Sequence, residues 1–224
     1  MKIVPVSVTL VHATPDPSRI VEAMGRICYQ SSHRVKPCEA CEGERGHSCY
    51  KCNGAGTDEQ SATDFVRMVI GRGHESVIEH VSAGFRIVTD RGVTHELVRH
   101  RLASFSQEST RYCDYSGDRF GGDLGFIVPP GLSEDAGSTW YCAVETSEGM
   151  YKGLRARGVP PEIARSILPN SLKAEIGMTC NAREWRHFLC LRLSPKAHPQ
   201  MREVAAMIRG HLVKWFPAAF EDFK

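Results

Sequence analysis

Long apolar runs and an excess of one charge are both missing from this sequence. No apolar run approaches the ~20 residues that a membrane-spanning helix needs, so we expect no membrane segment. Lys and Arg number 28 and Asp and Glu number 26, a balance that does not favour nucleic acid or an anionic membrane as a partner. Residues 1–17 contain no signal-peptide cleavage pattern, which favours a cytoplasmic protein. Apolar residues make up 42% of the chain, enough to exclude a disordered protein and to build a buried core.

The cysteines do not have the pattern of a secreted disulfide framework. Their number, nine, is odd, and we therefore expect a reducing compartment. Five of them are scattered, and we expect these to be small buried apolar side chains: Cys28, Cys113, Cys142, Cys180 and Cys190.

The other four cysteines form two C-x2-C pairs separated by seven residues: Cys38 and Cys41, then Cys49 and Cys52. Each pair can wrap one side of a tetrahedral metal ion, and four thiolates leave no open position for catalysis. The second pair resembles half of a zinc-binding repeat of J-domain chaperones over fewer than 20 residues. The pattern favours a structural zinc site over four free thiols or two redox disulfides. His47, inside the loop, is expected to be an ordinary solvated residue.

The remaining sequence predicts an α+β fold, with a central, mostly antiparallel sheet and helices packed on it. We expect one domain over 1–224, interrupted by a Cys-rich insert at 33–60. The periodicity predicts strands at 2–13, 81–89 and 126–130, a strand or short helix at 171–180, and helices at 16–31, 62–72, 93–102, 134–157, 161–168, 182–192 and 199–216.

The segment 99–112 is the richest in groups that bind anions. It holds three arginines, one histidine and four serine or threonine hydroxyls, and guanidinium forks and hydroxyls suit phosphate. If 106–112 is extended, Gln107, Ser109 and Arg111 project to one face. Charge alone favours a plainer interpretation, a solvated basic helix end followed by a polar loop.

The same segment resembles a signature of the flavin-dependent thymidylate synthases, R-H-R-x7-S, with Arg99-His100-Arg101 followed after seven residues by Ser109. Three further segments resemble motifs of that family in the same order: Gly73–His80 (G-H-x-S/T-x-x-E-H), Ala164–Pro169 (A-R-x-x-L-P) and Asn181–Arg192 (N-A-R-x-x-x-N/H-x-x-x-x-R). The matches run from about residue 20 to 205. The chain departs from the family pattern at Glu96, where many members have Gln, at Gln107, where some have Glu, and in the 33–60 insert.

The resemblance implies an activity and a set of small molecules. The family methylates C5 of dUMP to give dTMP, with methylenetetrahydrofolate as carbon donor and NADPH-reduced FAD as hydride donor. It also implies a homotetramer whose sites are shared between chains. The sequence lacks a G-x-G-x-x-G fingerprint, so FAD would bind without a Rossmann fold.

Residue roles follow from the resemblance position by position. It assigns to Arg192 the cation that stabilises negative charge on the pyrimidine, whereas the plainer interpretation is a charge at a helix C-terminus. The dUMP site would comprise Glu96, Leu97, Val98, Arg99, Gln107, Glu108, Ser109, Thr110, Arg111, Arg165 and Arg192. The FAD and folate site would comprise His74, Ser76, Glu79, Arg99, His100, Arg101, Leu102, Gln107, Asn181, Ala182, Arg183 and His187.

Two other functions remain open from the sequence. The first is a related flavin enzyme, a C5-methylase or hydroxymethylase of UMP or dCMP. The presence of Glu96, where many family members have Gln, is the feature that leaves this alternative open. The second is a zinc-knuckle binding protein for nucleic acid or a protein partner, in which the enzyme core is an inactive scaffold. The balanced charge and the retained motif residues speak against this second function.

Overall fold

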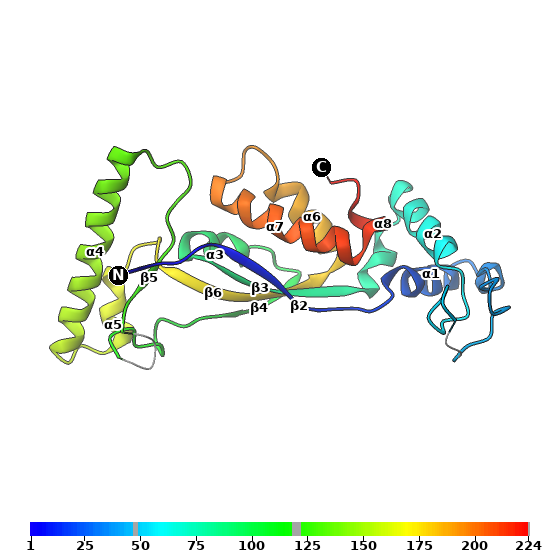
Figure 1. Ribbon diagram of the computed structural model, residues 1–224, viewed down its shortest axis with the longest axis horizontal. Helices are drawn as coiled ribbons and strands as arrows, with labels where there is room; N and C mark the ends of the chain where they lie inside the picture. Colours follow the sequence, from blue (N-terminus) through cyan, green and yellow to red (C-terminus); the bar gives the residue numbers. More distant parts are fainter. Residues whose placement is uncertain (47–48, 118–121, 224) are drawn as a thin grey trace. The chain divides into compact units, whose positions relative to one another are not determined.

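The computed structural model of the chain describes residues 1–46, 49–117 and 122–223 (Figure 1). The described residues form two compact units, and each is considered by itself. The first unit comprises Met1–Thr9, Phe85–Met178 and Arg192–Met207. The second comprises Leu10–Gly84, Thr179–Leu191 and Ile208–Lys224.

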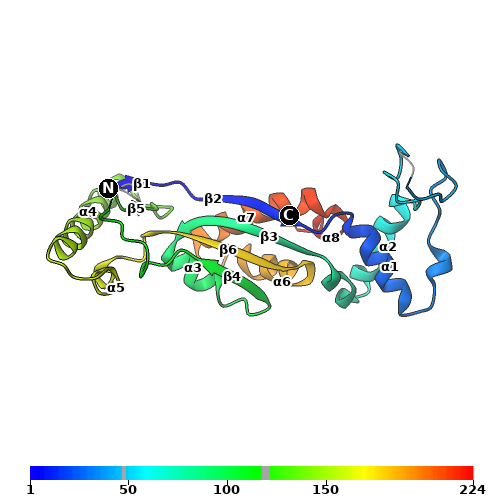
Figure 2. The same cartoon turned by 90° about the horizontal axis from the view of Figure 1, so that it is seen from below.

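A four-stranded antiparallel sheet forms the centre of the fold, with the strand order β2-β3-β6-β4 (Figure 2). Its strands are β2 (Ser7–Ala13), β3 (Ser82–Asp90), β4 (Ala103–Gln107) and β6 (Lys173–Asn181). Burial alternates along β6, where Ala174, Ile176, Met178 and Cys180 are buried. This period of two is typical of a strand with one face on a core, and it settles the 171–180 segment as strand. The predicted α+β class is confirmed.

In the first unit, a long helix packs on two short strands. The elements are β1 (Lys2–Ile3), β5 (Gly125–Phe126), α3 (Arg91–Leu97), α4 (Glu134–Ala156), α5 (Pro161–Ala164) and the 3-10 turn η4 (Arg165–Ile167). β1 and β5 pair in parallel. The side chains of Leu124, Phe126, Val144, Tyr151 and Leu172 form the buried core that joins α4 to this part of the chain.

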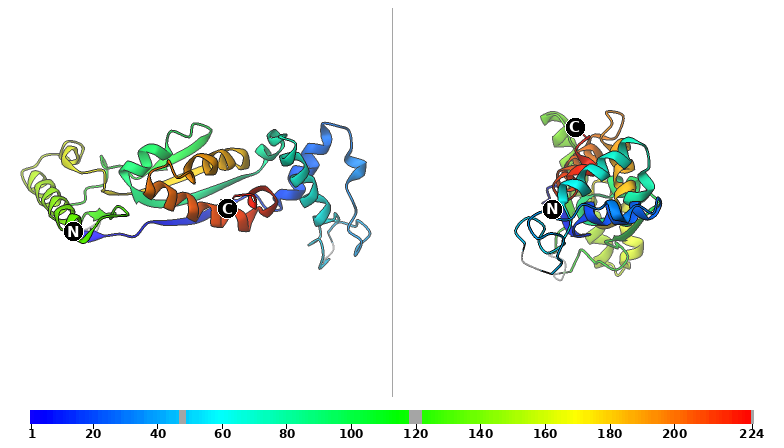
Figure 3. Two further views of the ribbon diagram at one scale, coloured as in Figure 1. Left: turned by 90° about the horizontal axis from the view of Figure 1, so that it is seen from above. Right: turned by 90° about the vertical axis from the view of Figure 1, so that its right-hand side faces the viewer.

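In the second unit, α1 (Pro17–Ile27) and α2 (Glu59–Gly71) lie side by side, and the 3-10 turns η1 (Ser32–Arg34) and η2 (Glu75–His80) follow them (Figure 3). A Cβ atom at Gly25 would lie 2.7 Å from the Phe65 ring, so glycine is what allows the two helices to approach. The last helices are α6 (Ala182–Arg192), α7 (Pro199–Trp215) and α8 (Pro217–Phe220), and α7 runs from the first unit into the second. Arg186 makes two hydrogen bonds to Asp222, of 2.8 and 2.7 Å, and thereby fixes the chain after α8.

Several predicted boundaries were wrong for identifiable reasons. α2 begins at Glu59, before the predicted 62, because the Asp58 carboxylate caps its first N–H groups. The predicted 93–102 helix ends at Leu97, and 103–107 is a strand that the polar composition concealed. The predicted strand 2–13 is interrupted between Ile3 and Ser7, and only Phe126 of the predicted 126–130 strand belongs to β5.

The scattered cysteines are less buried than predicted. Cys180 is buried in β6 and Cys113 is half-buried, but Cys28, Cys142 and Cys190 are exposed. Cys142 and Cys190 lie on the solvent faces of α4 and α6, and Cys28 follows the last turn of α1. None of the helices in the described parts of the chain is long and apolar enough to cross a membrane.

Candidate active site

Arg192, the last residue of α6, is held from two sides in the first unit. Its Nη1 donates to Glu96 Oε2 at 2.8 Å and its Nη2 to the Glu96 carbonyl oxygen at 3.3 Å. Its Nε donates to Nε2 of His100 at 3.1 Å. The guanidinium is therefore anchored by α3 and by the turn that follows it, and its direction is fixed before any ligand binds.

His100 is buried, and its contact with Arg192 defines its tautomer. A guanidinium has no acceptor, so Nε2 of His100 must accept and the ring proton lies on Nδ1. The middle residue of the R-H-R motif therefore contacts the Arg192 guanidinium.

The residues that flank His100 face solvent. Arg99, Arg101 and Leu102 are exposed, and Leu102 retains 75% of its accessible surface. Val98 is also exposed, whereas Leu97 is buried in the core. The exposed cations lie on a turn between α3 and β4, where they are available to an anionic ligand.

The loop after β4 is built by Gln107 and Glu108. The amide of Gln107 donates to the buried Thr94 hydroxyl at 2.9 Å. The Glu108 carboxylate accepts from Tyr115 Oη at 2.7 Å, from Lys173 Nζ at 2.7 Å and from the Glu175 N–H at 3.1 Å. The Glu108 side chain therefore fixes the loop to β6.

Ser109 and Arg111 do not lie on a strand face, contrary to the prediction for an extended 106–112 segment. β4 ends at Gln107, and the chain then turns, with the Cys113 N–H donating to the Ser109 carbonyl oxygen at 2.9 Å. The Ser109 hydroxyl accepts from the Arg111 N–H at 3.3 Å, which starts this turn. The Arg111 side chain is exposed beside the Tyr112 ring.

Arg165 and Thr110 meet at a separate cavity of about 390 Å³. Arg165 Nη1 donates to the Thr110 hydroxyl at 3.0 Å. Arg91, Glu162 and Ser166 line the same cavity, which gives it two guanidinium groups, two hydroxyls and one carboxylate. Guanidinium and hydroxyl groups suit phosphate. The sequence analysis did not predict Arg91 as a site residue, because Arg91 lies in none of the motifs and its only signal is its position after a predicted strand. The Arg165–Thr110 hydrogen bond has no residue in common with the contacts of Arg192 to Glu96 and His100.

The residues assigned to the flavin by resemblance lie mostly in the second unit. The Asn181 side chain accepts from the Glu184 N–H at 2.9 Å and so begins α6, whose first residue, Ala182, is buried. Arg183 is exposed and donates to Glu79 at 2.6 Å. His187 is exposed one turn along the same helix.

His74 and Ser76 lie elsewhere in that unit, exposed at the wall of a cavity of about 960 Å³. Hydroxyl, guanidinium and imidazole groups suit the phosphates and rings of a flavin dinucleotide, so the side chains present fit that cofactor.

The four clustered cysteines converge in the second unit. Their sulfur atoms all lie within 4.8 Å of one another, with 3.8 Å from Cys38 to Cys49 and 3.6 Å from Cys41 to Cys52. Four sulfurs about 2.3 Å from one zinc ion lie about 3.8 Å apart, whereas a disulfide requires about 2.05 Å. The arrangement fits a tetrahedral metal and excludes the two-disulfide alternative in this conformation. His47 lies outside the described residues.

The protein backbone favours a thiolate in this cluster. Burial opposes the ionisation of Cys52, but the Gly56 N–H, which donates to its sulfur at 3.3 Å, and the neighbouring thiols outweigh it and lower the pKa of Cys52 to about 6. Burial and the hydrogen bond to Cys52 raise the pKa of Cys41 to about 12. One thiol of the cluster is thus ready to bind a cation, and a metal ion would ionise the others.

Comparison with known proteins gives a consistent result. The family model described as "Thymidylate synthase complementing protein" matches residues 9–218. A flavin-dependent thymidylate synthase of Geobacter sulfurreducens is 34% identical over 96% of this chain and 85% of its own length. The Mycobacterium tuberculosis protein of that name is 33% identical over 92% of this chain and 79% of its own.

A solved structure agrees with the sequence relatives. The UMP/dUMP methylase PolB of Streptomyces cacaoi, bound with 5-Br dUMP, superposes with a TM-score of 0.75 at 25% identity over 99% of this chain and 96% of its own. The match of the family model over nearly the whole chain, and the identity to these relatives, confirm the resemblance seen in the motifs. The chain belongs to the thymidylate synthase complementing protein family, the family of the flavin-dependent thymidylate synthases.

Proposed function

We propose that this protein methylates C5 of dUMP to give dTMP, with methylenetetrahydrofolate as the carbon donor and NADPH as the reductant. One observation carries the proposal: the Arg192 guanidinium is fixed by Glu96 and His100 beside the exposed arginines of the R-H-R motif. Family membership and the dUMP analogue bound to PolB support the choice of substrate.

The roles of the protein side chains follow from their chemistry. The Arg192 cation stabilises negative charge as it develops on the pyrimidine ring, so that C5 becomes nucleophilic without a cysteine adduct. Arg165 and Thr110, with Arg91, hold the 5′-phosphate. Ser109 begins the loop that presents its N–H groups to the same phosphate. Ser76, Arg183 and His187 would hold FAD, which, when bound and reduced by NADPH, would supply the hydride that completes the methyl group.

The four-cysteine cluster holds a structural zinc ion in this proposal. The support is the 3.6–3.8 Å spacing of the sulfurs and the N–H donated to Cys52. Four sulfur ligands leave no position for substrate, so the ion folds the insert and takes no part in methyl transfer.

The active form would be a homotetramer of single-domain chains, each interrupted by the 33–60 insert. Two observations support an assembled site. The Arg192 group and the Arg165–Thr110 pair are separate within one chain, and the arginines of the R-H-R motif are exposed. A second chain would supply the missing side of each partial site.

A second candidate substrate is UMP. PolB is described as a methylase of both UMP and dUMP, and the Glu96 carboxylate of this chain places a negative charge beside the cation that faces the pyrimidine. The substrate test therefore includes UMP and dCMP beside dUMP. A binding protein on an inactive scaffold, the remaining alternative, would release no label from any of them.

Release of tritium from dUMP labelled at C5 tests the proposed function. Purified protein should carry flavin absorbance. After its flavin is removed, it should release tritium only when NADPH, FAD and methylenetetrahydrofolate are all added. Release from labelled UMP but not from dUMP would transfer the proposal to the second candidate. Protein that is colourless and inactive in all arms would contradict the proposed function.

A further inference from the structure

The cavity that His74 and Ser76 line in the second unit combines the insert with the helices beside it. Its volume is about 960 Å³, at the upper end of the range for small-molecule sites. Its walls come from α1, from the chain after α1, from α2 and from the turn that follows α2. Part of the wall is therefore formed by the insert, which the family resemblance does not cover.

The wall of this cavity carries an excess of positive charge. Three arginines and one lysine line it, against one aspartate. Arg26 is already engaged, since it donates to the buried Glu22 at 2.6 Å, and Asp64 is paired with Arg67 at 3.5 Å. The other three cations, Arg34, Lys36 and Arg72, are exposed, and none of them forms an ion pair with a described residue.

The same cavity has an apolar, aromatic side. Phe65, Val69 and Val77 line it, and the Tyr29 ring at its edge retains 73% of its accessible surface. A ligand that matched the cavity would therefore combine a flat ring with several negative charges. His74 and Ser76 line the cavity too, which connects it to the side chains assigned to cofactor.

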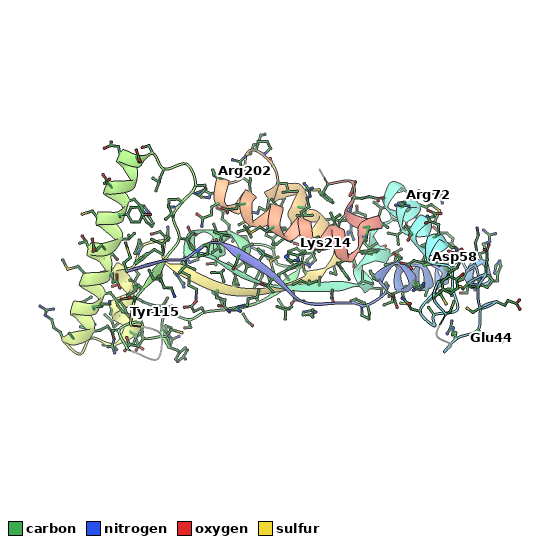
Figure 4. The ribbon with its side chains drawn as sticks, viewed as in Figure 1. Glu44, Asp58, Arg72, Tyr115, Arg202 and Lys214 are labelled. Atoms are coloured by element: carbon green, nitrogen blue, oxygen red, sulfur yellow. The ribbon has the colours of Figure 1, made fainter. Side chains whose placement is uncertain are left out.

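The cysteine cluster helps to hold in place the chain segment that carries Arg34 and Lys36. The Asp58 N–H donates to the Lys36 carbonyl oxygen at 2.9 Å, and Pro37 bridges to Thr57. The next residue, Cys38, donates its N–H to the Gly56 carbonyl oxygen at 3.0 Å and contributes its sulfur to the cluster. The arm that carries Arg34 and Lys36 is thus tied to the N-terminus of α2, and Arg72 ends the same helix (Figure 4).

We propose that this cavity binds the anionic arm of an aromatic co-substrate, and that Arg34 and Lys36 of the insert, with Arg72, are the cations that recognise it. This inference rests on the proposed function, because the co-substrates are those of the synthase reaction. Two of them have the required chemistry: NADPH carries phosphates, and a polyglutamyl folate carries a row of carboxylates. The insert is then a specificity element for that co-substrate, with its metal cluster as support.

The test compares two pairs of substitutions in the holoenzyme. Arg34→Ala with Lys36→Ala removes two cations from the cavity wall. Arg45→Ala with Lys51→Ala removes two exposed cations of the same insert that do not line this cavity. Arg72→Ala removes the cation on α2 and leaves the insert sequence intact. Flavin content, kcat and KM are measured for each variant with NADPH or NADH and with monoglutamyl or polyglutamyl folate.

The Arg34→Ala, Lys36→Ala variant should raise one KM about tenfold or more, and Arg72→Ala should raise the same KM. The kcat and flavin content of these variants should stay within twofold of the unsubstituted protein. A rise for NADPH but not NADH identifies the phosphate, and a rise for polyglutamyl but not monoglutamyl folate identifies the carboxylates. The control pair should leave every KM within twofold.

Equal effects of the two pairs, or no rise in any KM, would overturn the inference while the wild-type activity still supports the proposed function. Loss of flavin from the cavity pair would also overturn it, because the cavity would then belong to the flavin. Calorimetric titration of NADP⁺ and of polyglutamyl folate keeps the inference testable if the protein proves inactive. Weaker binding by the Arg34→Ala, Lys36→Ala variant than by the Arg45→Ala, Lys51→Ala variant would support the inference. Equal binding by the two variants would overturn it.

Discussion

At the scale of single residues, the arrangement around Arg192 combines a fixed cation with a neighbouring negative charge. Glu96 and His100 hold the guanidinium from two sides, and the Arg192 side chain retains 19% of its accessible surface. A charge held in place before the reaction costs little reorganisation when charge develops on the substrate. The same Glu96 carboxylate weakens the field that the cation presents.

Replacing Arg192 with alanine should abolish most thymidylate formation and leave flavin bound. Removing one preorganised charge of this kind raises a barrier by about 3–4 kcal/mol, which is about 10²–10³ in rate. The measurement is single-turnover dTMP formation beside flavin absorbance. The exposed Arg157→Ala serves as the control and should keep full activity. Near-normal turnover of the Arg192→Ala protein would remove this arginine from the mechanism.

Glu96→Gln should increase kcat/KM for dUMP. Glutamine keeps an oxygen that accepts from Arg192, but it removes a negative charge beside the cation that faces the pyrimidine. An ion pair with one partner about one-third exposed is worth at most about 1 kcal/mol after solvent screening, so the expected gain is about fivefold. Steady-state kinetics with dUMP and UMP measure it. A fall in kcat/KM for both nucleotides would show that the carboxylate itself is required.

At the scale of elements, the loop that follows β4 is fastened to α4 by one carboxylate. Asp114 accepts from Arg155 Nε at 3.1 Å and from Nη2 at 2.6 Å, and from the Ser116 hydroxyl at 2.6 Å. The hydrogen bonds from Arg155 and Ser116 outweigh burial and hold the pKa of Asp114 well below its usual range. The position of Thr110, farther back on this loop, depends on that anchor.

Asp114→Asn should therefore lower the free energy of unfolding at pH 7 by about 2 kcal/mol, the usual worth of hydrogen bonds to a charged group. Because the folded-state pKa is depressed, the stabilisation is complete above about pH 4 and is lost as the pH falls through the folded-state value. Urea unfolding from pH 7 down to pH 3 should show the difference between the two proteins shrinking. The exposed Glu145→Gln on α4 is the control. A difference that grew on acidification would contradict the account.

The Cys-rich insert should lose its metal and its local order in the Cys38→Ser, Cys52→Ser protein. Wild-type protein should contain one zinc per chain, with X-ray absorption showing four sulfur neighbours at about 2.3 Å. Its affinity should fall at low pH because the ligands must be deprotonated. Flavin binding and kcat should persist, because α1 and α2 pack on each other directly through Gly25 and Phe65.

The exposed Cys142→Ser is the control for that experiment and should retain the metal. Loss of flavin or of assembly in the double variant would make the insert part of the core. Iron in place of zinc would change the identity of the metal and leave the four ligands as they are.

Periodicity predicted the long elements well and the chemistry of the turns poorly. The helices at 134–156 and 182–192 follow from apolar spacing, and so does β3, where buried Phe85 and Ile87 alternate with exposed Arg86. The strand at 103–107 was missed because an edge strand rich in serine has no apolar face to signal it.

Motif resemblance predicted which residues belong to the site, but it did not predict the contacts that those residues make. Nothing in the sequence pairs Glu96 with Arg192 or brings Arg34 and Lys36 to a cavity wall, because those contacts depend on tertiary packing.

At the scale of the whole molecule, one chain offers parts of several sites. The Arg192 group and the Arg165–Thr110 pair are distinct, and the side chains assigned to flavin come from separate segments. Homotetramer formation is the assembly that completes them in the proposed function. Light scattering of the flavin-loaded protein should report four chains, and a fully active monomer would contradict a shared site.

In the proposed function, this chain converts dUMP to dTMP with reduced flavin. Mass spectrometry of the nucleotide after anaerobic incubation with NADPH, FAD and methylenetetrahydrofolate tests it most directly, with each component omitted in turn. Protein from which the flavin has been removed should form dTMP in the complete mixture and none in any omission, and Arg192→Ala should form at least a hundredfold less. Unchanged dUMP in the complete mixture with flavin-loaded protein, or dTMP formed equally without flavin, would contradict it.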